Sequence, residues 1–557
     1  MQFINKIINK NSYVFCILWL TLFVLYLPAV NAGFVSDFTG WLDQVRNWPF
    51  IDYLNRKNFG IKSLYQFTQL STYALYKLLG TSLWAWHLLH ISLQAINSFL
   101  LYKLFKRFAT DAGLTQAAYI AFFGSFLFCV TPYISEVVVW EAAFHYLQGM
   151  LFIVLILNWA QQYHHSQHKK YVWWSAILFF IATFSLEIFY LVPWFVLTMA
   201  IYYRFGLKYD KAIFKKVLLY FFLPQIVMFI GHLILYHAVY GEWVAHIGEN
   251  TIVSQKASGF LSKPVKYFYH IFLMGRFYPG SWKEKIYAFC ATTPLLVVFY
   301  SILGIIGLYV ITRFRTMSAK LQLMSLTFVW MWMTLALLSP TWFMELFLLF
   351  DDRYSYIFDA FVYFFIVMAI SCISLQLIRT VVLALFILIN VRYTIQLNRY
   401  WMKSSRILHS LHTHMPDAGN KVIVILNLPQ CLNGIPMITA SDDMEYKLRH
   451  NLLYKPINNI LYDGVSYNML TPADGAHVTV VNDSTAKVTL NQWGTWWWYN
   501  NRGALSYENE YFKINMVDQG HWYEIVLKKD PYTYQLLYQV GDQWKVVDWS
   551  KKNQDQN

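Results

Sequence analysis

The sequence predicts a polytopic α-helical membrane protein that ends in a small extracytoplasmic domain of α/β or mainly β structure. Of its 557 residues, 57% are hydrophobic and only 13% are charged, whereas a soluble domain carries charge on about 25% of its residues. Apolar segments of about 20 residues, long enough to cross a bilayer core, recur between Ser12 and Ile395. Beyond Asn398 they give way to short segments rich in β-branched and aromatic residues. We therefore predict a membrane domain over 1–397 and a soluble domain over 398–557.

Hydropathy predicts eleven membrane spans. They cover residues 12–32, 82–102, 114–131, 137–159, 171–186, 188–204, 217–237, 288–311, 321–339, 354–375 and 380–397. Basic residues collect in alternate loops, on one side of the membrane. They are Lys6, Lys10, Lys103, Lys106, Arg107, Lys169, Lys170, Arg204, Lys208, Lys211, Lys215, Lys216, Arg313, Arg315, Lys320 and Arg379. The positive-inside rule places this side and the N-terminus in the cytoplasm, and residues 398–557 outside.

Two outer loops are long, 33–81 and 238–287, and each is predicted to contain an interfacial helix. In the first, "SLYQFTQLSTYALYKLLG" places apolar residues at helical spacing between polar ones. In the second, "KPVKYFYHIFLMGRFYPG" is too short to span a membrane. This second loop is basic despite its outer position, and long loops weaken the positive-inside rule. The first span is predicted to be an uncleaved anchor, because further spans follow it.

The soluble domain is predicted to be a mainly antiparallel β meander after an α/β start. Its strand-like segments are "KVIVILNLP", "HVTVV", "AKVTL", "WGTWWWYN", "YFKINMV", "WYEIVLKK", "YTYQLLYQV" and "QWKVVDW". Only Cys431 of the five cysteines lies there, which excludes a disulfide framework. The net charge of +14 needs no nucleic-acid partner, because the cytoplasmic excess follows from topology and suits anionic headgroups. The histidine-rich "YHHSQHKK" lies in a cytoplasmic loop without carboxylates, so no metal site is predicted there.

Acidic and basic residues gather at the outer ends of the predicted spans, where ionisable groups are costly unless they are paired or used. They are Asp37, Glu136, Glu141, Glu187, Asp351, Asp352 and Arg353. They come from loops far apart in sequence at similar depth, so we predict that they line one cavity. Such a cavity suits glycosyl transfer from a lipid-linked sugar, because a carboxylate such as Asp37 can take the proton of the acceptor. Arg353, Arg276 or a lysine of the loop 238–287 would stabilise the anionic phosphate that leaves.

Each of these residues also has a purely structural interpretation, and the sequence leaves both open. Asp37 is then an interfacial acid, Glu187 the polar tip of a turn and His145 a packing histidine. Asp351 and Asp352 pair with Arg353 in a structural ion cluster. The aromatic run "WGTWWWYN" either stacks on sugar or belongs to a sheet core or an interfacial belt.

Four stretches, in order, resemble membrane glycosyltransferases of the GT-C class, most closely the O-mannosyltransferase-like branch whose eukaryotic members carry tetratricopeptide repeats. They are "GFVSDFTGW", "TPYISEVVVWEAAFHYLQGMLF", "FSLEIFYLVPW" and "DDRYSY". In them Asp37, Glu136 with Trp140, Glu187, and Arg353 with Tyr354 stand at the motif positions. The chain departs from the branch at Ser36, Phe144, Tyr146 and Leu186, and no repeat array follows. Instead "VIVILNLPQCLNG" resembles the small extracytoplasmic domain of bacterial relatives.

The resemblance implies a polyprenyl-phosphate-linked sugar donor, an outward-facing site and Asp37 as the catalytic base. Glu136, Glu141, His145 and Glu187 would line the cavity, and Arg353, Arg276 and Tyr354 would bind the donor phosphate. A divalent metal is used in some branches of the class only, so the cofactor stays open. The departures leave the sugar and the acceptor open as well, and they leave open a divergent or inactive member.

The sequence thus favours an inverting glycosyltransferase of a bacterial inner membrane, acting on a protein, lipid or glycan outside. A transporter or flippase of lipid-linked saccharides is the first alternative, and it predicts ionisable groups near span centres rather than at their outer ends. A non-catalytic receptor or assembly factor is the second, and it predicts that Asp37 can be replaced without consequence.

Overall fold

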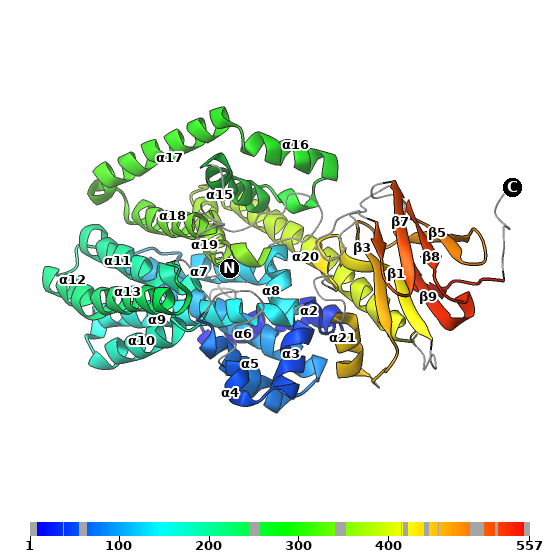
Figure 1. Cartoon of the computed structure of the whole chain (residues 1–557). Helices are drawn as coiled ribbons and strands as arrows, with labels where there is room; N and C mark the ends of the chain where they lie inside the picture. Colours follow the sequence, from blue (N-terminus) through cyan, green and yellow to red (C-terminus); the bar gives the residue numbers. More distant parts are fainter. Residues whose placement is uncertain are drawn as a thin grey trace.

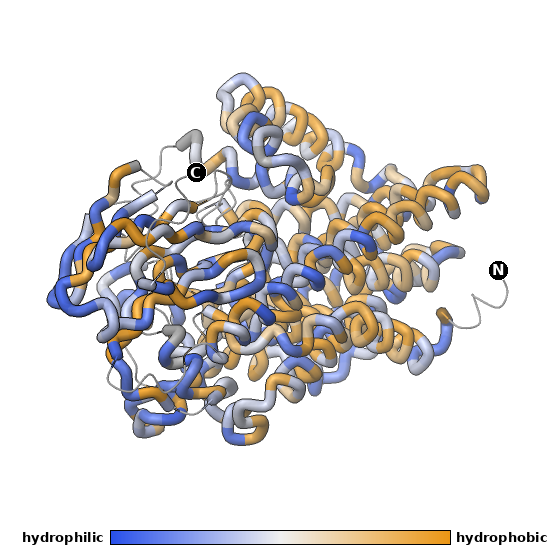
Figure 2. The backbone as a smooth tube through the Cα atoms, turned by 90° about the vertical axis from the view of Figure 1, so that its right-hand side faces the viewer, coloured by the Kyte–Doolittle hydropathy of each residue, from blue (hydrophilic) through white to orange (hydrophobic). Residues whose placement is uncertain are grey.

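The computed structural model has a helical part and a β-rich part joined by one long helix, α20 (Figure 1). It describes residues 8–36, 38–54, 64–185, 187–243, 257–339, 352–413, 415, 421–438, 445–454, 456–490, 506–518 and 522–550. Hydrophobic residues dominate the helical part, and hydrophilic residues are frequent along the strands (Figure 2). The protein is therefore a mostly helical chain with a C-terminal β-sheet domain, as expected for a polytopic membrane protein.

The helices of the first part follow the apolar segments of the sequence. They are α2 (Asn11–Tyr26), α3 (Phe38–Asn47), α4 (Phe50–Leu54), α5 (Gln66–Leu79), α6 (Leu83–Asp111), α7 (Ala117–Val130), α8 (Ser135–Val139), α9 (Phe144–Ser166), α10 (Lys169–Ala182), α11 (Val192–Ile201), α12 (Lys211–Val217), α13 (Leu223–Tyr240), α15 (Ala257–Phe272), α16 (Gly280–Cys290), α17 (Thr293–Arg313), α18 (Ala319–Leu338), α19 (Asp352–Ile370) and α20 (Gln376–Thr413).

Within the described ranges, nine helices are long and apolar enough to cross a membrane, or ten if one bent pair counts as a single span. The predicted number of eleven is therefore too high for this part of the chain. The segment 171–186 forms α10, a helix of only 14 residues. The segment 114–131 forms α7, which ends before Pro132, and the next helical piece is bent away by 56°. Pro132 causes this break, because it has no N–H to continue the helix.

The bundle encloses some helices and leaves others exposed. In α9 and α19, 78% and 72% of an 18-residue apolar stretch is buried. In α17 only 6% of such a stretch is buried. Figure 1 shows α17 and α16 standing apart from the bundle, and α17 therefore has almost its whole surface available to lipid. The long loops contain helices at the predicted places, with α3 to α5 in the first and α15 and α16 in the second.

Among its described residues, the β-rich part contains two five-stranded sheets and one α-helix, α21 (Glu445–Leu453). The strands are β1 (Val422–Leu432), β2 (Ile435–Pro436), β3 (Leu461–Met469), β4 (Ala476–Val480), β5 (Thr485–Leu490), β6 (Tyr507–Glu508), β7 (Phe512–Asp518), β8 (Trp522–Leu527), β9 (Tyr534–Val540) and β10 (Gln543–Val546). One sheet is antiparallel throughout, in the order β4-β5-β8-β7-β6.

The other sheet is mixed, because β1 pairs in parallel with both β3 and β9. The predicted α/β start lies here. The other described strand pairs are antiparallel, as predicted for most of the domain, so β9 is the strand that departs from the predicted meander. β1 turns into β2 through Asn433 and Gly434, which both have positive φ, as a tight hairpin requires. The predicted strand "WGTWWWYN" lies outside the described residues. The predicted domain boundary at 397–398 falls within α20, which continues to Thr413.

Candidate active site

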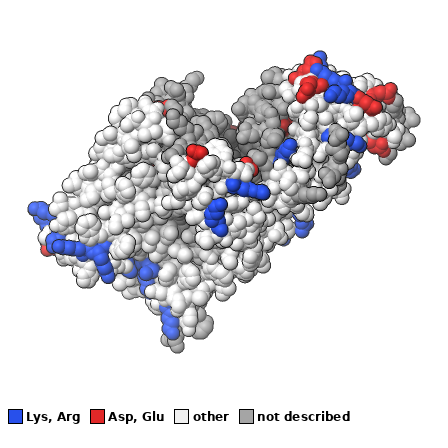
Figure 3. All heavy atoms as spheres, turned by 60° about the horizontal axis from the view of Figure 1, so that its bottom comes forward, with Lys and Arg blue, Asp and Glu red and all other residues white. Residues whose placement is uncertain are grey.

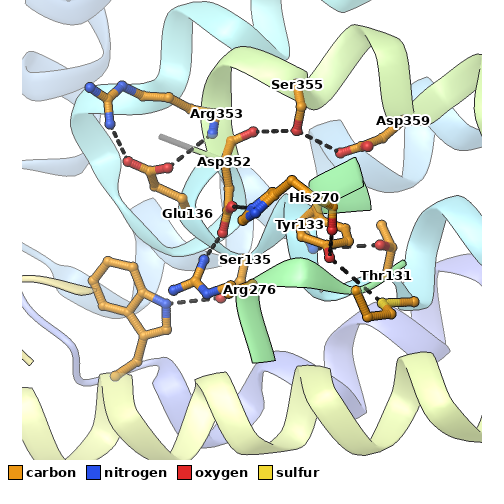
Figure 4. A network of polar contacts seen from close by, with 12 residues as sticks. Thr131, Tyr133, Ser135, Glu136, His270, Arg276, Asp352, Arg353, Ser355 and Asp359 are labelled. Atoms are coloured by element: carbon orange, nitrogen blue, oxygen red, sulfur yellow. Dashed lines mark hydrogen bonds and ion pairs between the residues drawn. The ribbon is translucent and has the colours of Figure 1, made fainter. Parts of the chain in front are cut away.

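Glu136 and Arg353, far apart in sequence, meet at one end of the bundle (Figure 4). Glu136 lies on α8, just after the break at Pro132, and Arg353 lies in the first turn of α19. The Arg353 Nη1 forms an ion pair with Glu136 Oε1, and the backbone N–H of Arg353 donates to Glu136 Oε2 over 2.9 Å. The guanidinium also stacks on Trp140 and Tyr354, at 5.0 and 4.6 Å from the ring centres. One carboxylate therefore ties α8 to the start of α19.

Asp352 forms a second buried ion pair beside the first. Its carboxylate contacts the Arg276 guanidinium and lies 3.0 Å from His270 Nε2. Burial, followed by the positive charges of Arg276 and Lys283, lowers the pKa of His270 well below its usual range, so the ring is neutral. A carboxylate can only accept, so Nε2 carries the proton and Nδ1 accepts from the Tyr287 hydroxyl at 2.7 Å. The interpretation in which Asp352 pairs with Arg353 is wrong, because Asp352 pairs with Arg276. Asp351 lies outside the described residues.

A cavity of about 180 Å³ adjoins these ion pairs, between the second long loop, α20 and the β-rich part. Its lining residues are Arg276, Phe277, Tyr278, Lys283, Gln396, Leu397, Asn433 and Leu470. Arg276 and Lys283 are 6% and 4% exposed. Burial lowers the pKa of Lys283 to about 7 and that of Arg276 to about 10. Arg276 already pairs with Asp352, and an anionic ligand in the cavity would offset the cost of burying the Lys283 ammonium as well.

The β-rich part closes this site. Gly434, Ile435 and Pro436 of the β1–β2 hairpin lie against Glu136, Arg276 and Trp401, around a gap of about 10 Å³. The Trp401 indole donates to Ser135 beside them over 2.9 Å. Residues of the soluble domain therefore form part of the wall.

His145 and Glu187 lie in an aromatic group that reaches the first ion pair. The Tyr65 hydroxyl donates to Glu187 over 2.5 Å. The centre of the His145 ring lies 4.7 Å from that of Tyr146 and 6.4 Å from that of Tyr65. The ring centres of Tyr146 and Tyr354 are 6.3 Å apart. The predicted cavity residues His145 and Glu187 and the predicted phosphate-binding residue Tyr354 thus belong to one continuous set of contacts.

Glu141 is 4% exposed and lies near another cation, Arg449 of α21, whose positive charge interacts with its carboxylate. Asp37 lies outside the described residues, so its catalytic role stays a prediction. Its neighbours Ser36 and Phe38 are both buried.

Sequence reasoning missed His270 and Arg449. His270 stands among aromatic residues in "KYFYHIF", which is typical of packing, and nothing local marks its contact with Asp352. Arg449 lies in the soluble domain, and its contact with Phe34 spans 415 positions.

Ionisable groups also occur deeper in the bundle, which the prediction did not expect. Asp359 lies two turns into α19 with no exposed surface, and it accepts from Ser355 over 3.2 Å. His90 is buried in α6 and contacts the Val137 carbonyl. Among the described residues, no group of three or more His, Cys, Asp or Glu side chains is placed to hold a metal ion.

A larger crevice of about 510 Å³ lies elsewhere, between the end of α11, the end of α17 and α18. Ile201, Phe205, Ile311 and Leu326 are among its lining residues, which include one charged side chain, Arg315, and no carboxylate within the described part of the chain. Its composition suits an apolar chain rather than the polar chemistry of the candidate site.

No protein-family model matches the chain, and no curated protein matches it. The GT-C likeness therefore rests on the motifs in the sequence.

Proposed function

We propose that the protein is an inverting GT-C-type glycosyltransferase of a bacterial inner membrane. It moves a sugar from a polyprenyl-phosphate-linked donor to a protein, lipid or glycan at the outer face. The observation that carries the proposal is the meeting of Glu136, Arg353 and Arg276 at one end of the bundle, next to a cavity lined by Arg276 and Lys283. Three segments distant in sequence converge there, and the cavity suits a phosphate.

Each charged group has one role in the proposed reaction. Asp37 takes the proton of the acceptor hydroxyl as its oxygen attacks the anomeric carbon of the sugar. The bond from that carbon to the phosphate oxygen breaks on the opposite face, which inverts the configuration, and the polyprenyl phosphate leaves with the electron pair. Arg276 and Lys283 stabilise the charge that develops on it. The ion pair of Glu136 and Arg353 holds the adjoining wall in place.

The distribution of charge supports the orientation that this function needs. Figure 3 shows Lys and Arg along one edge of the helical part, mixed charges on the β-rich part and a mostly uncharged face between them. A basic edge opposite the soluble domain is typical of the cytoplasmic side. The candidate site lies at the end of the bundle that carries the soluble domain.

The deciding experiment measures sugar transfer by purified protein from a defined polyprenyl-phosphate sugar. Asp37→Asn keeps the shape and removes only the base, so it should abolish transfer while polyprenyl-phosphate binding and expression stay close to those of the wild type. Asp52→Asn, at an exposed position of the same loop, is the matched control and should transfer normally. Full activity in Asp37→Asn would refute the mechanism.

A transporter of lipid-linked saccharides is the second candidate, and buried Asp359 is the observation that favours it. Carboxylates inside spans often mark an ion or substrate path. Reconstituted vesicles separate the two candidates. A transporter moves the lipid-linked sugar across the bilayer without cleaving it and loses this activity in Asp359→Asn, whereas the enzyme releases polyprenyl phosphate.

A further inference from the structure

The segment Gly33–Ser36, which ends one residue before Asp37, is held by three hydrogen bonds from distant parts of the chain. The Trp140 indole donates to the Val35 carbonyl over 3.1 Å. The other two bonds come from the soluble domain. The Ser36 N–H donates to the Met437 carbonyl over 3.1 Å, and Arg449 Nε donates to the Phe34 carbonyl over 2.7 Å.

Arg449 is buried at this contact, with 3% of its surface exposed. Its Nη1 contacts His412 Nε2 on α20, and its charge interacts with Glu141. It therefore joins α21, α20 and the first outer loop. Gly33 makes room for it, because a Cβ at this position would lie 2.7 Å from Arg449 Nη2. Gly33 also has a φ of +79°, which favours glycine.

The chain on the other side of Asp37 is fixed as well. The Thr39 N–H and hydroxyl both contact the Ser36 carbonyl, at 3.3 and 3.0 Å. The Phe38 ring packs edge-on against Trp86, with 5.1 Å between the ring centres. The described residues on both sides of position 37 are therefore held by contacts, Ser36 with Met437 and Thr39, and Phe38 with Trp86.

We infer that Arg449 is a positioning residue for the Asp37 carboxylate, and that the soluble domain thereby completes the active site. This inference rests on the proposed function. General-base catalysis depends on placement, and an error of about 1 Å can cost about a hundredfold in rate. Arginine suits the task because its several N–H groups bind the Phe34 carbonyl and His412 together.

The test compares kcat, KM and polyprenyl-phosphate binding in two variants of the full-length protein. Arg449→Met removes the contact with Phe34. Trp544→Phe removes a different bond of the soluble domain, from the indole to the Ile407 carbonyl on α20, which does not involve the Gly33–Ser36 segment. We expect Arg449→Met to lower kcat by about 10- to 100-fold with KM and lipid binding unchanged, and Trp544→Phe to keep kcat.

Two further variants keep the test decisive if Arg449→Met folds poorly. Gly33→Ala displaces the guanidinium from the side of the loop and should lower kcat in the same way. Arg449→Lys keeps the charge and should retain more kcat than Arg449→Met. If Arg449→Met and Trp544→Phe lower activity equally, or if Gly33→Ala and Arg449→Met change only KM, the inference is overturned.

A double-mutant comparison separates this inference from the proposed function. Asp37→Glu keeps a carboxylate but displaces it, so Arg449→Met should cost less kcat in that background than in the wild type. Equal losses in both backgrounds would show that Arg449 does not act through Asp37. Full activity in Asp37→Asn, in contrast, would refute the proposed function itself.

Discussion

Replacing Arg353 by alanine should destabilise the protein strongly, because it leaves the Glu136 carboxylate buried without its cation. Glu136 is 4% exposed, and the Arg353 side chain is 17% exposed. Breaking a buried ion pair from one side costs about 3–5 kcal/mol. The partial exposure of Arg353 places our expectation at the lower end, about 3 kcal/mol, which corresponds to about a hundredfold change in the unfolding equilibrium.

The same reasoning predicts a rescue. Glu136→Gln removes the charge but keeps an oxygen that accepts from the backbone N–H of residue 353, which now binds Glu136 Oε2 over 2.9 Å. The double variant should therefore recover about 2 kcal/mol of the loss, since no uncompensated charge is left. The measurement is equilibrium unfolding in mixed micelles titrated with a denaturing detergent.

The exposed ion pair of Lys528 with Glu508, at 2.7 Å, supplies the control. Lys528→Ala should leave stability unchanged within error, because exposed pairs contribute little. If Arg353→Ala is no more harmful than Lys528→Ala, or if Glu136→Gln restores nothing, the ion pair does not tie α8 to α19 as described.

Three further results are expected. Because the pKa of Lys283 is lowered to about 7, its charge is present below this pH and lost above it. Affinity for polyprenyl phosphate should then fall as the pH rises through about 7, and Lys283→Arg should remove this dependence in a binding titration. Gly124→Ala should lower the free energy of unfolding by about 1–3 kcal/mol, because the new methyl would lie 2.4 Å from the Phe364 ring. Gly231→Ala, where the methyl meets open space, is the control. A reporter fused after the last residue should score as extracytoplasmic and one at Lys215 as cytoplasmic; scores on one side would contradict the topology.

The positions of the helices could be predicted because hydropathy is a local property. Each predicted span contains a helix in the structure. The count was less accurate, because it depends on where a helix stops. Thr183 follows α10 after 14 residues, and no residue near it has the plain signal that Pro132 gives at the end of α7.

Several residues of the candidate site could be picked out from the sequence, but the pairs that they form could not. Glu136 and Arg353 stand out as charges beside apolar runs, which made both visible in the sequence. The partner of Asp352 was not visible, because the adjacent Arg353 looked like the natural choice and the actual partner, Arg276, is brought in by a distant loop. Arg449 could not be found at all, since tertiary packing alone decides which carbonyl it reaches.

The length of α20 gives the soluble domain a fixed height above the bilayer. Its 38 residues extend about 57 Å at 1.5 Å per residue, whereas about 20 residues cross the hydrocarbon core. The remaining turns continue the helix beyond the core, and the Trp544 indole donates to the Ile407 carbonyl near the C-terminal end of α20. The separation between the apolar part of α20 and the sheets is thus determined by one continuous helix.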